Sequence, residues 1–278
     1  MKRLECDLPD SIFEALHERI RQEGDTCDHI VSVALADSLS KPLHTLFQVS
    51  TSAALVEGLY QGAVRVSRLL SHGDFGLGTF IDLDGEMVVL EGVCYRVASD
   101  GRVTVVEGNR LIPYAVVTRF VSEFGKRFSK IDSFEELEAA CDQLRSSDNV
   151  FYALRVEGRF SFLKTRVMSP VPAGIGLGAA SSEQKEFNYQ EQEGALVGLW
   201  SPGFASSFSV PGYHFHFLSA DRKRGGHVLD CKFDDVTVGG CEMHEMHVSL
   251  PETEEFLKAD LSRDPESELT KVERNHEA

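Results

Sequence analysis

The sequence predicts an α+β protein in which mixed and antiparallel β-sheets, with a few flanking helices, form two β-rich lobes. Runs of β-branched and aromatic residues fill much of the chain, as in MVVLEGVCYRV at 87–97 and VFYALRVEGRFSFLKTRV at 150–167. Gly, Asp and Asn bound these runs, as is typical of strands joined by turns. Signals for helix starts occur at only a few positions, so we expect few helices.

The two lobes are expected to meet at a connection rich in Pro, Gly, Ser and Gln. This segment spans 168–192, between an N-terminal mixed-sheet lobe at 1–167 and a C-terminal β lobe at 193–278. The last residues of the chain are polar and acidic and are interrupted by Pro265. They predict a surface helix followed by a tail.

Two helices have clear sequence signals. The first begins at Asp10 or Ser11, continues with apolar residues at helical spacing and ends at Gly24. The second begins at Ser133, where the following glutamates complete a capping box. Shorter patterns predict two further helices, at 51–59 and 115–124.

Composition and charge argue against two classes of function. Hydrophobic residues make up 42% of the 278 residues, and no run of about 18 apolar residues is present to span a bilayer. The net charge is −16, from 44 acidic and 28 basic residues, so the averaged field repels nucleic-acid phosphates. The basic stretch at 221–224 is better explained as a hairpin loop. We expect no membrane insertion and no nucleic-acid partner.

The N-terminus and the cysteines both indicate a cytoplasmic protein. Glu5, Asp7 and Asp10 interrupt the N-terminal segment, which lacks the apolar core of a secretory signal. The six cysteines form no C-x-x-C pair. Their spacing suits reduced, mostly buried thiols better than disulfides or a thiolate zinc site.

A histidine cluster is the first candidate for chemistry. In YHFHF at 213–217 the period of two places His214 and His216 on one face of a strand and the aromatic residues on the other. If the chain turns back near residue 221 or 222, His227 lies opposite His216 on the next strand.

Three imidazoles on one face of a hairpin can bind one divalent cation. The alternative is a set of structural histidines on a half-buried sheet. We favour the metal, because a third histidine falls at a distance that suits the hairpin. Three neutral nitrogen donors without a thiolate leave coordination positions open, as in catalytic zinc sites.

Three other motifs carry weaker signals for chemistry. His244 and His247 would point to opposite faces of a strand and could not share a metal without a bulge. HGDFGLGT at 72–79 lacks the Gly-Lys-Ser/Thr ending of a P-loop and precedes a strand, an Asp-Gly turn and a strand. Glu86 at this turn is either solvated or directed into a pocket, and Arg166 faces solvent unless an anion lies beside it.

Three blocks of sequence together resemble the α-acetolactate decarboxylase family. They are HGDFGLGTFIDLDGEMVVLEGVCYRV, FYALRVEG followed by KTRV, and GYHFHF followed by GGHVLDC. The similarity runs in order from about Leu46 to the C-terminus. It implies zinc-dependent decarboxylation of (S)-2-acetolactate, which is 2-hydroxy-2-methyl-3-oxobutanoate, to (R)-acetoin and CO2 in the acetoin and 2,3-butanediol pathway.

The resemblance also implies which residues act. The ligands of one Zn2+ per chain correspond to His214, His216 and His227. The matching catalytic positions are Glu86 in LDGEM, Arg166 in KTRV and Glu273 in KVER, and Thr79 in GLGTF matches a threonine of the substrate pocket. The metal would serve as the electron sink for the loss of CO2, without an organic cofactor. Either glutamate could hold the proton, and one of them could complete the metal shell.

Two alternatives fit parts of the same pattern. A non-catalytic zinc-binding protein would need the histidines but would have no use for Glu86 and Arg166. A cupin-like metal oxygenase also begins with His-x-His on a strand, but the glutamate expected a few residues later is missing after His216. We expect a small-molecule substrate and, because sheets leave exposed strand edges, a homodimer.

Overall fold

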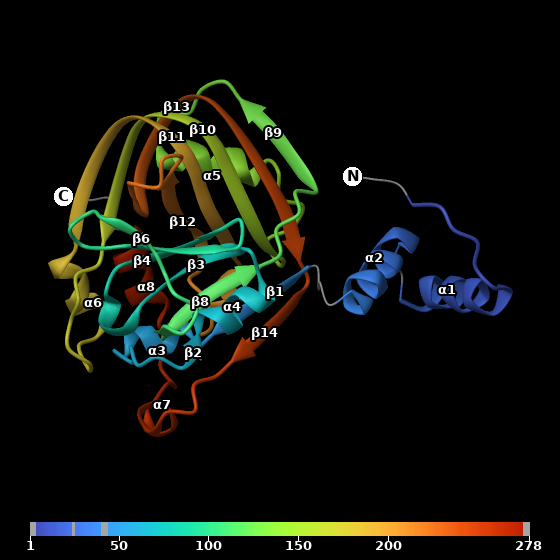
Figure 1. The fold of residues 1–278 in the computed structure, drawn as a ribbon, viewed down its shortest axis with the longest axis horizontal. Coiled ribbons are helices and arrows are strands. Elements are labelled where there is room, and N and C mark those ends of the chain that lie inside the picture. Colours follow the sequence, from blue (N-terminus) through green and yellow to red (C-terminus); the bar gives the residue numbers. More distant parts are fainter. Residues whose placement is uncertain (1–3, 24–25, 40–43, 275–278) are drawn as a thin grey trace. The chain divides into compact units, whose positions relative to one another are not determined.

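The computed structural model describes residues 4–23, 26–39 and 44–274 (Figure 1). The chain divides into two compact units, Met1–Leu43 and His44–Ala278. Within the described part of the chain, no helix combines the length and the apolar character needed to cross a membrane.

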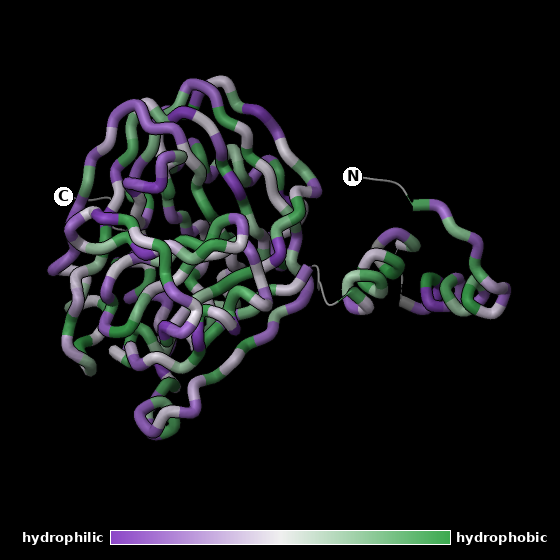
Figure 2. Tube along the Cα trace, in the orientation of Figure 1, coloured by the Kyte–Doolittle hydropathy of each residue, from purple (hydrophilic) through white to green (hydrophobic). Residues whose placement is uncertain are grey.

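The first unit contains two helices, α1 (Asp10–Glu23) and α2 (Cys27–Ser38). The helix start predicted at Asp10 or Ser11 is confirmed, and the end predicted at Gly24 lies outside the described residues. Figure 2 shows that hydrophobic residues dominate α2, whereas α1 mixes hydrophilic and hydrophobic residues. Large apolar side chains of α1, such as Ile12 and Phe13, are exposed.

The second unit is built around two sheets. Seven strands form the first sheet in the order β14-β1-β8-β3-β4-β5-β6, and all neighbours are antiparallel except β1 and β14. Their bounds are β1 Thr45–Val49, β3 Phe75–Thr79, β4 Glu86–Leu90, β5 Val93–Val97, β6 Val103–Val105, β8 Tyr114–Thr118 and β14 Glu245–Ser249. A separate short pair joins β2 (Val64–Arg65) to β7 (Leu111–Ile112).

The second sheet has five strands in the order β10-β11-β12-β13-β9. Because β10 also pairs with β13, four of these strands close into a ring. Their bounds are β9 Phe124–Phe128, β10 Phe151–Val167, β11 Lys185–Ser201, β12 Gly212–Ser219 and β13 Gly225–Met243. Figure 1 shows the long strands β10, β11 and β13 curving around α5 (Phe134–Asp142).

Short helices connect and cover the sheets. The α-helices are α3 Ser52–Val56, α4 Val66–His72, α6 Leu177–Ala180, α7 Glu254–Lys258 and α8 Glu266–Arg274. Three single turns of 3-10 helix are η1 Ile81–Leu83, η2 Ser181–Glu183 and η3 Gly203–Ala205. The side chains of Thr51 and Ser133 cap α3 and α5, because each hydroxyl accepts a hydrogen bond from a backbone N–H of the first turn.

Apolar side chains form three buried clusters in this unit. One lies between the two sheets and joins residues such as Val88 of β4 and Val197 of β11. The second lies between the five-stranded sheet and α5, and the third lies between the opposite face of the seven-stranded sheet and α4. Figure 2 shows hydrophobic segments running through the interior of both sheets. The first sheet is therefore buried on both faces.

The predicted fold class is confirmed, because mainly antiparallel sheets carry a few helices. The helices predicted at 51–59 and from Ser133 are present as α3 and α5. The helix predicted at 115–124 is wrong, because Tyr114–Thr118 is a central strand of the first sheet. Every residue of this strand is buried, so its apolar run lacks the alternation that marks a half-buried strand.

The expected lobes differ from the actual distribution of strands. β10 precedes the expected connection at 168–192 and β11 begins inside it, yet the two strands pair along most of their length. Residues 185–192 are polar and resemble a loop, but exposed and half-buried residues alternate along them as in a strand. The chain then returns to the first sheet, where β14 pairs with β1.

The C-terminal segment also differs from the expected surface helix and tail. Leu269 and Val272 of α8 are buried and belong to the cluster between the two sheets. The apolar residues of this short helix are few, so composition alone gave no sign of its burial. The position of α8 matters because it carries Glu273.

Candidate metal and catalytic site

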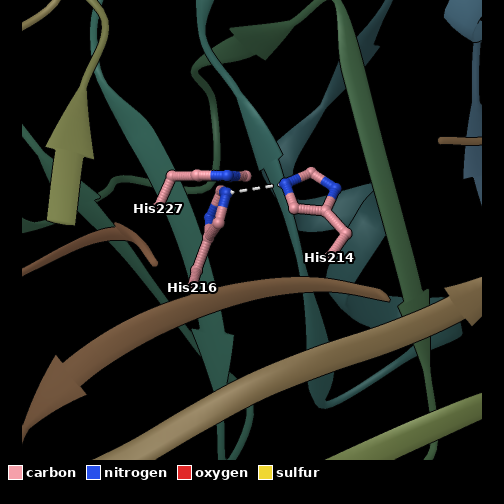
Figure 3. Close-up of side chains that lie close together, drawn as sticks. All are labelled: His214, His216 and His227. Carbon is pink, nitrogen blue, oxygen red and sulfur yellow. Dashed lines mark hydrogen bonds between the residues drawn. The ribbon is translucent and has the colours of Figure 1, made fainter. Parts of the chain in front are cut away.

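Three buried histidines converge from a hairpin of the five-stranded sheet. His214 and His216 lie on β12, and the predicted pairing of His216 with His227 on β13 is confirmed. One ring nitrogen from each histidine lies within 4.8 Å of those from the other two, and His214 Nε2 is 3.1 Å from His216 Nε2 (Figure 3). Phe215 and Phe217 belong to the cluster around α5, on the opposite face.

Burial keeps all three imidazoles neutral. It lowers the pKa of His216 to about 3 and the pKa values of His214 and His227 well below the usual value, and nearby Arg166 also lowers all three. His216 Nδ1 lies 2.7 Å from the Met87 carbonyl oxygen, to which it must donate a hydrogen bond. His216 Nε2 thereby keeps its lone pair, which can accept a hydrogen bond from His214 Nε2 or bind a metal ion, the arrangement that orients a metal-binding imidazole.

The donor set fits a divalent metal ion. His227 Nδ1 is buried and has no hydrogen-bond partner among the described residues. A buried nitrogen in that state is costly, and coordination would remove the cost. Three neutral imidazoles with a carboxylate nearby suit zinc in a site with open positions. Among the residues that the structure describes, no other group of His, Cys, Asp and Glu meets the same spacing.

Two glutamates and one arginine surround the histidines. Arg166 on β10 pairs with His227 across the sheet and is 3% exposed. Arg166 Nη2 lies 2.9 Å from Glu273 Oε2, and Nη1 lies 3.6 Å from Glu86 Oε1. Glu273 Oε2 is 3.4 Å from His227 Nδ1, and Glu86 Oε2 is 3.6 Å from His216 Nε2. One guanidinium group thus links both carboxyl groups beside the histidine cluster.

Burial raises the pKa of both carboxyl groups. The pKa of Glu86 rises to about 7, because burial and the nearby Glu273 outweigh Arg166 and the hydrogen bond from the Met168 N–H. Burial also raises the pKa of Glu273, although the directly bonded Arg166 opposes it. Glu86 can therefore retain a proton near neutral pH.

Cross-strand neighbours of the first sheet form the facing wall. Glu86 on β4 is opposite Thr79 on β3, and Thr79 is opposite Tyr114 on β8. Directly opposite residues project to the same face of a sheet, so these three side chains share a wall. The Thr79 hydroxyl donates a hydrogen bond to the Gly85 carbonyl oxygen at 3.0 Å. The sequence prediction missed Tyr114, because its position beside Thr79 requires the strand order.

These residues enclose a cavity of about 40 Å³. The rest of its lining is mainly apolar and comes from both sheets and the short helices: Leu55, Gly78, Leu83, Met168, Leu177 and Val210. A cavity of this kind can orient a small polar molecule through a few charged groups while excluding water. The structure thus brings together every site residue expected from the sequence; their roles remain predictions.

The other motifs form no second site of this kind among the described residues. His247 packs edge-on against Phe47, whereas His244 Nε2 lies 3.3 Å from Glu242 Oε2, so the two histidines do not share a site. The glycine-rich stretch forms β3, where a Cβ on Gly78 would lie only 2.5 Å from the Tyr114 carbonyl oxygen. The charged residues at 221–224 lie in the predicted hairpin loop between β12 and β13. All six cysteines are free, and four of them are buried.

Comparisons with known proteins point to one family. A family model described as "Alpha-acetolactate decarboxylase" matches residues 46–263. An alpha-acetolactate decarboxylase of Methanosarcina mazei is 38% identical over 230 residues, which cover 82% of this chain and 80% of the relative. The protein of that name from Methylococcus capsulatus is 35% identical over 268 residues, which cover 95% of this chain and 98% of the relative.

A solved structure agrees in fold. The crystal structure of alpha-acetolactate decarboxylase from Bacillus subtilis strain 168 matches with a TM-score of 0.78 and 33% sequence identity, covering 83% of this chain and 99% of that chain. The family model includes the histidines, Thr79, Glu86 and Arg166 but ends before Glu273. The place of Glu273 beside the histidines therefore rests on the packing of α8.

Proposed function

The chain belongs to the alpha-acetolactate decarboxylase family and is a carbon–carbon lyase, and we propose that it converts (S)-2-acetolactate to (R)-acetoin and CO2. The observation that carries this proposal is a cluster of three neutral histidines next to two carboxyl groups and one guanidinium. Acetolactate carries a carboxylate, a carbonyl and a hydroxyl group, and this cavity offers partners for each. The reaction belongs to acetoin and 2,3-butanediol formation.

We assign one zinc ion per chain to His214, His216 and His227. Glu273 Oε2, at 3.4 Å from His227 Nδ1 and 3.7 Å from His214 Nε2, is a carboxylate within reach of the same ion. When bound, zinc would supply the electron sink that the loss of CO2 from a 3-oxo acid requires. The second sheet holds these ligands, whereas Glu86 and Thr79 approach from the first sheet.

Arg166 would meet the negative charge of the substrate. Its Nη2 is hydrogen-bonded to Glu273, while its Nε is buried without a hydrogen-bond partner among the described residues. At least one N–H donor is therefore uncommitted. A guanidinium held rigidly between two glutamates can orient an anionic substrate before the reaction.

We assign delivery of the proton to Glu86. The C–C bond to the carboxylate breaks, CO2 leaves, and the electron pair stays on the remaining enediol fragment. A proton from Glu86 then forms the new C–H bond of acetoin, and solvent returns a proton to Glu86. Glu273 is less suited to this step, because Arg166 bonds it at 2.9 Å and favours its charged form. The raised pKa of Glu86, about 7, supports this division.

The test is formation of acetoin from racemic acetolactate by the purified protein, with metal content measured in the same samples. We expect (R)-acetoin by chiral chromatography, loss of turnover with a chelator and recovery with Zn2+. His216→Ala should lose both zinc and turnover, whereas the exposed His244→Ala should keep both. A His216→Ala protein with stoichiometric zinc and full turnover would contradict the metal assignment. Zinc-loaded wild type that made no acetoin would contradict the function.

The alternatives are less well supported. A non-catalytic zinc site does not need two buried carboxyl groups and an arginine beside its ligands. A cupin-like oxygenase would take its carboxylate from the strand after the histidines, whereas Glu86 and Glu273 come from β4 and α8. A cytoplasmic location and a homodimer stay predictions, the latter supported by β14 and β6 as the two edges of the first sheet.

A further inference from the structure

Tyr114 places in the cavity a hydroxyl group that has no hydrogen-bond partner among the described residues. The residue is 3% exposed and lines the cavity with Thr79 and Glu86, its neighbours along the register of β8, β3 and β4. Its hydroxyl donates to and accepts from none of the described residues. A buried tyrosine hydroxyl normally has a partner, so its absence in a cavity points to a partner that enters from outside.

Three other donors around the cavity are at least partly committed. The Thr79 hydroxyl donates to the Gly85 carbonyl oxygen, and His216 Nδ1 donates to the Met87 carbonyl oxygen. Arg166 Nη2 donates to Glu273. Among the described residues that line this cavity, Tyr114 therefore carries the one alcohol or phenol hydroxyl whose proton is free for a ligand.

We propose that Tyr114 is a further catalytic residue, whose hydroxyl donates a hydrogen bond to the substrate oxygen that gains negative charge as CO2 leaves. The inference rests on the proposed decarboxylation. The oxygens of the enediol fragment are the acceptors that become more basic during the reaction, whereas the carboxylate loses its charge on becoming CO2. A donor fixed by a central strand stabilises such a charge without having to reorganise.

The surroundings keep this phenol protonated and therefore able to donate. Burial raises the pKa of Tyr114, and the nearby Glu273 carboxyl raises it further. The Tyr114 ring packs in the apolar cluster between the two sheets. The backbone of Tyr114 on β8 also lies in close contact with Gly78 on β3, which holds β8 in place. Tyr114 thus donates a hydrogen bond and leaves delivery of the proton to Glu86.

The test compares Tyr114→Phe with Tyr60→Phe. Each variant removes the hydroxyl of a buried tyrosine for which no described residue provides a hydrogen-bond partner, but only Tyr114 lines the cavity. Both proteins are assayed as zinc-loaded full chains, with acetoin formation, kcat, KM, zinc content and thermal unfolding measured. Because the hydrogen bond strengthens in the transition state, we expect Tyr114→Phe to lower kcat roughly 10- to 100-fold while KM changes little. Zinc content should be unchanged, and Tyr60→Phe should keep wild-type kinetics.

Each outcome separates the two proposals. Wild type that makes acetoin, with a Tyr114→Phe kcat equal to wild type, would overturn the role of Tyr114 and leave the decarboxylase intact. A rise in KM with unchanged kcat would also overturn it, because the hydrogen bond would then be equally strong before and during the reaction. Loss of zinc in Tyr114→Phe would show a structural role instead. Wild type that makes no acetoin fails the proposed function itself.

Discussion

At the scale of single residues, Arg166 holds the site together. It is almost fully buried, and it is the cation that contacts both Glu86 and Glu273. Two carboxyl groups beside neutral histidines would repel each other without it. The fixed fork of a guanidinium also sets the angle between its two partners, which an ammonium group cannot do.

Replacement of this arginine tests the importance of that geometry. We expect Arg166→Lys to retain zinc but to lower kcat about 100-fold, because the substrate and the two glutamates lose their common orientation. Arg155→Lys is the matched control, since Arg155 lies on the same strand and contacts Glu91 and Glu157 away from the cavity. Steady-state kinetics and metal analysis of both variants decide the point. Equal kinetics for wild type and Arg166→Lys would place Arg166 outside the reaction.

Single residues also show which parts of the site can be predicted from the sequence and which cannot. The histidine spacing predicts His214, His216 and His227 directly, because a strand and a turn are local structures. Glu86, Arg166 and Glu273 come from β4, β10 and α8, and no local spacing connects them. Only the family resemblance brought them together before the fold was known. Neither the local spacing nor the family resemblance predicted Tyr114 as a site residue.

At the scale of elements, α8 determines where Glu273 lies. Leu269 and Val272 anchor the helix in the cluster between the sheets. Glu268 adds a polar contact, because its Oε1 accepts a hydrogen bond from the Gly178 backbone N–H at 3.1 Å. Glu273 follows little more than one turn later and reaches Arg166. The position of one carboxyl group in the site therefore depends on the docking of a nine-residue helix.

Loss of the Glu268 contact is expected to misplace Glu273. A net hydrogen bond of about 1 kcal/mol corresponds to roughly a fivefold change in the equilibrium constant for docking of α8, so Glu268→Ala should lower kcat by up to about that factor. Glu268→Gln keeps the acceptor and should restore most of the rate. Glu266→Ala, on an exposed position of the same helix, is the control. Hydrogen exchange of α8 should rise in Glu268→Ala alone, and unchanged exchange and kcat would exclude this role.

A histidine on α4 predicts a pH effect on stability. His72 stacks on Phe47 of β1 at 3.7 Å, and burial lowers its pKa, aided by His247, Arg68 and Arg119. The unfolded chain, with a pKa of about 6.5, therefore takes up this proton before the folded protein does. Stability present above that pH is lost as the pH falls toward the lower folded pKa.

The variant that tests this effect is His72→Phe, which keeps an aromatic ring on Phe47. Its melting temperature should fall less than that of wild type between about pH 7 and about pH 5. The control is His17→Phe, on the exposed surface of α1, which should follow the wild-type pH dependence. Parallel curves for His72→Phe and wild type would show that His72 does not contribute.

Elements were predictable where their sequence pattern is local. The capping box at Ser133 predicts α5 because its hydrogen bond lies within one turn, and a short apolar pattern predicts α3. The central strand β8 was not predictable in this way, since both of its faces are buried by segments far away in the sequence. The first half of β11 is polar because its side chains are exposed or half-buried. A polar segment of this kind cannot be distinguished from a loop by composition alone.

At the scale of the whole molecule, the site belongs entirely to the second unit. Its three histidines come from the five-stranded sheet, its facing wall comes from the seven-stranded sheet, and α8 supplies Glu273. The family model also begins at residue 46, within β1. The net charge of −16 does not oppose binding of an anionic substrate at this site, because Arg166 and a bound cation would set the local potential.

Removal of the first unit tests this division of labour. The unit His44–Ala278 contains all three apolar clusters and both sheets, so a chain that begins there should fold, retain one zinc and form acetoin with a kcat close to that of the full chain. Its melting temperature should change little, because the core is intact. Calorimetry, metal analysis and kinetics on the two proteins provide the comparison. A truncated chain that folds with zinc but has lost most of its turnover would show that residues 1–43 act on the site, and the second unit would then not be sufficient for catalysis.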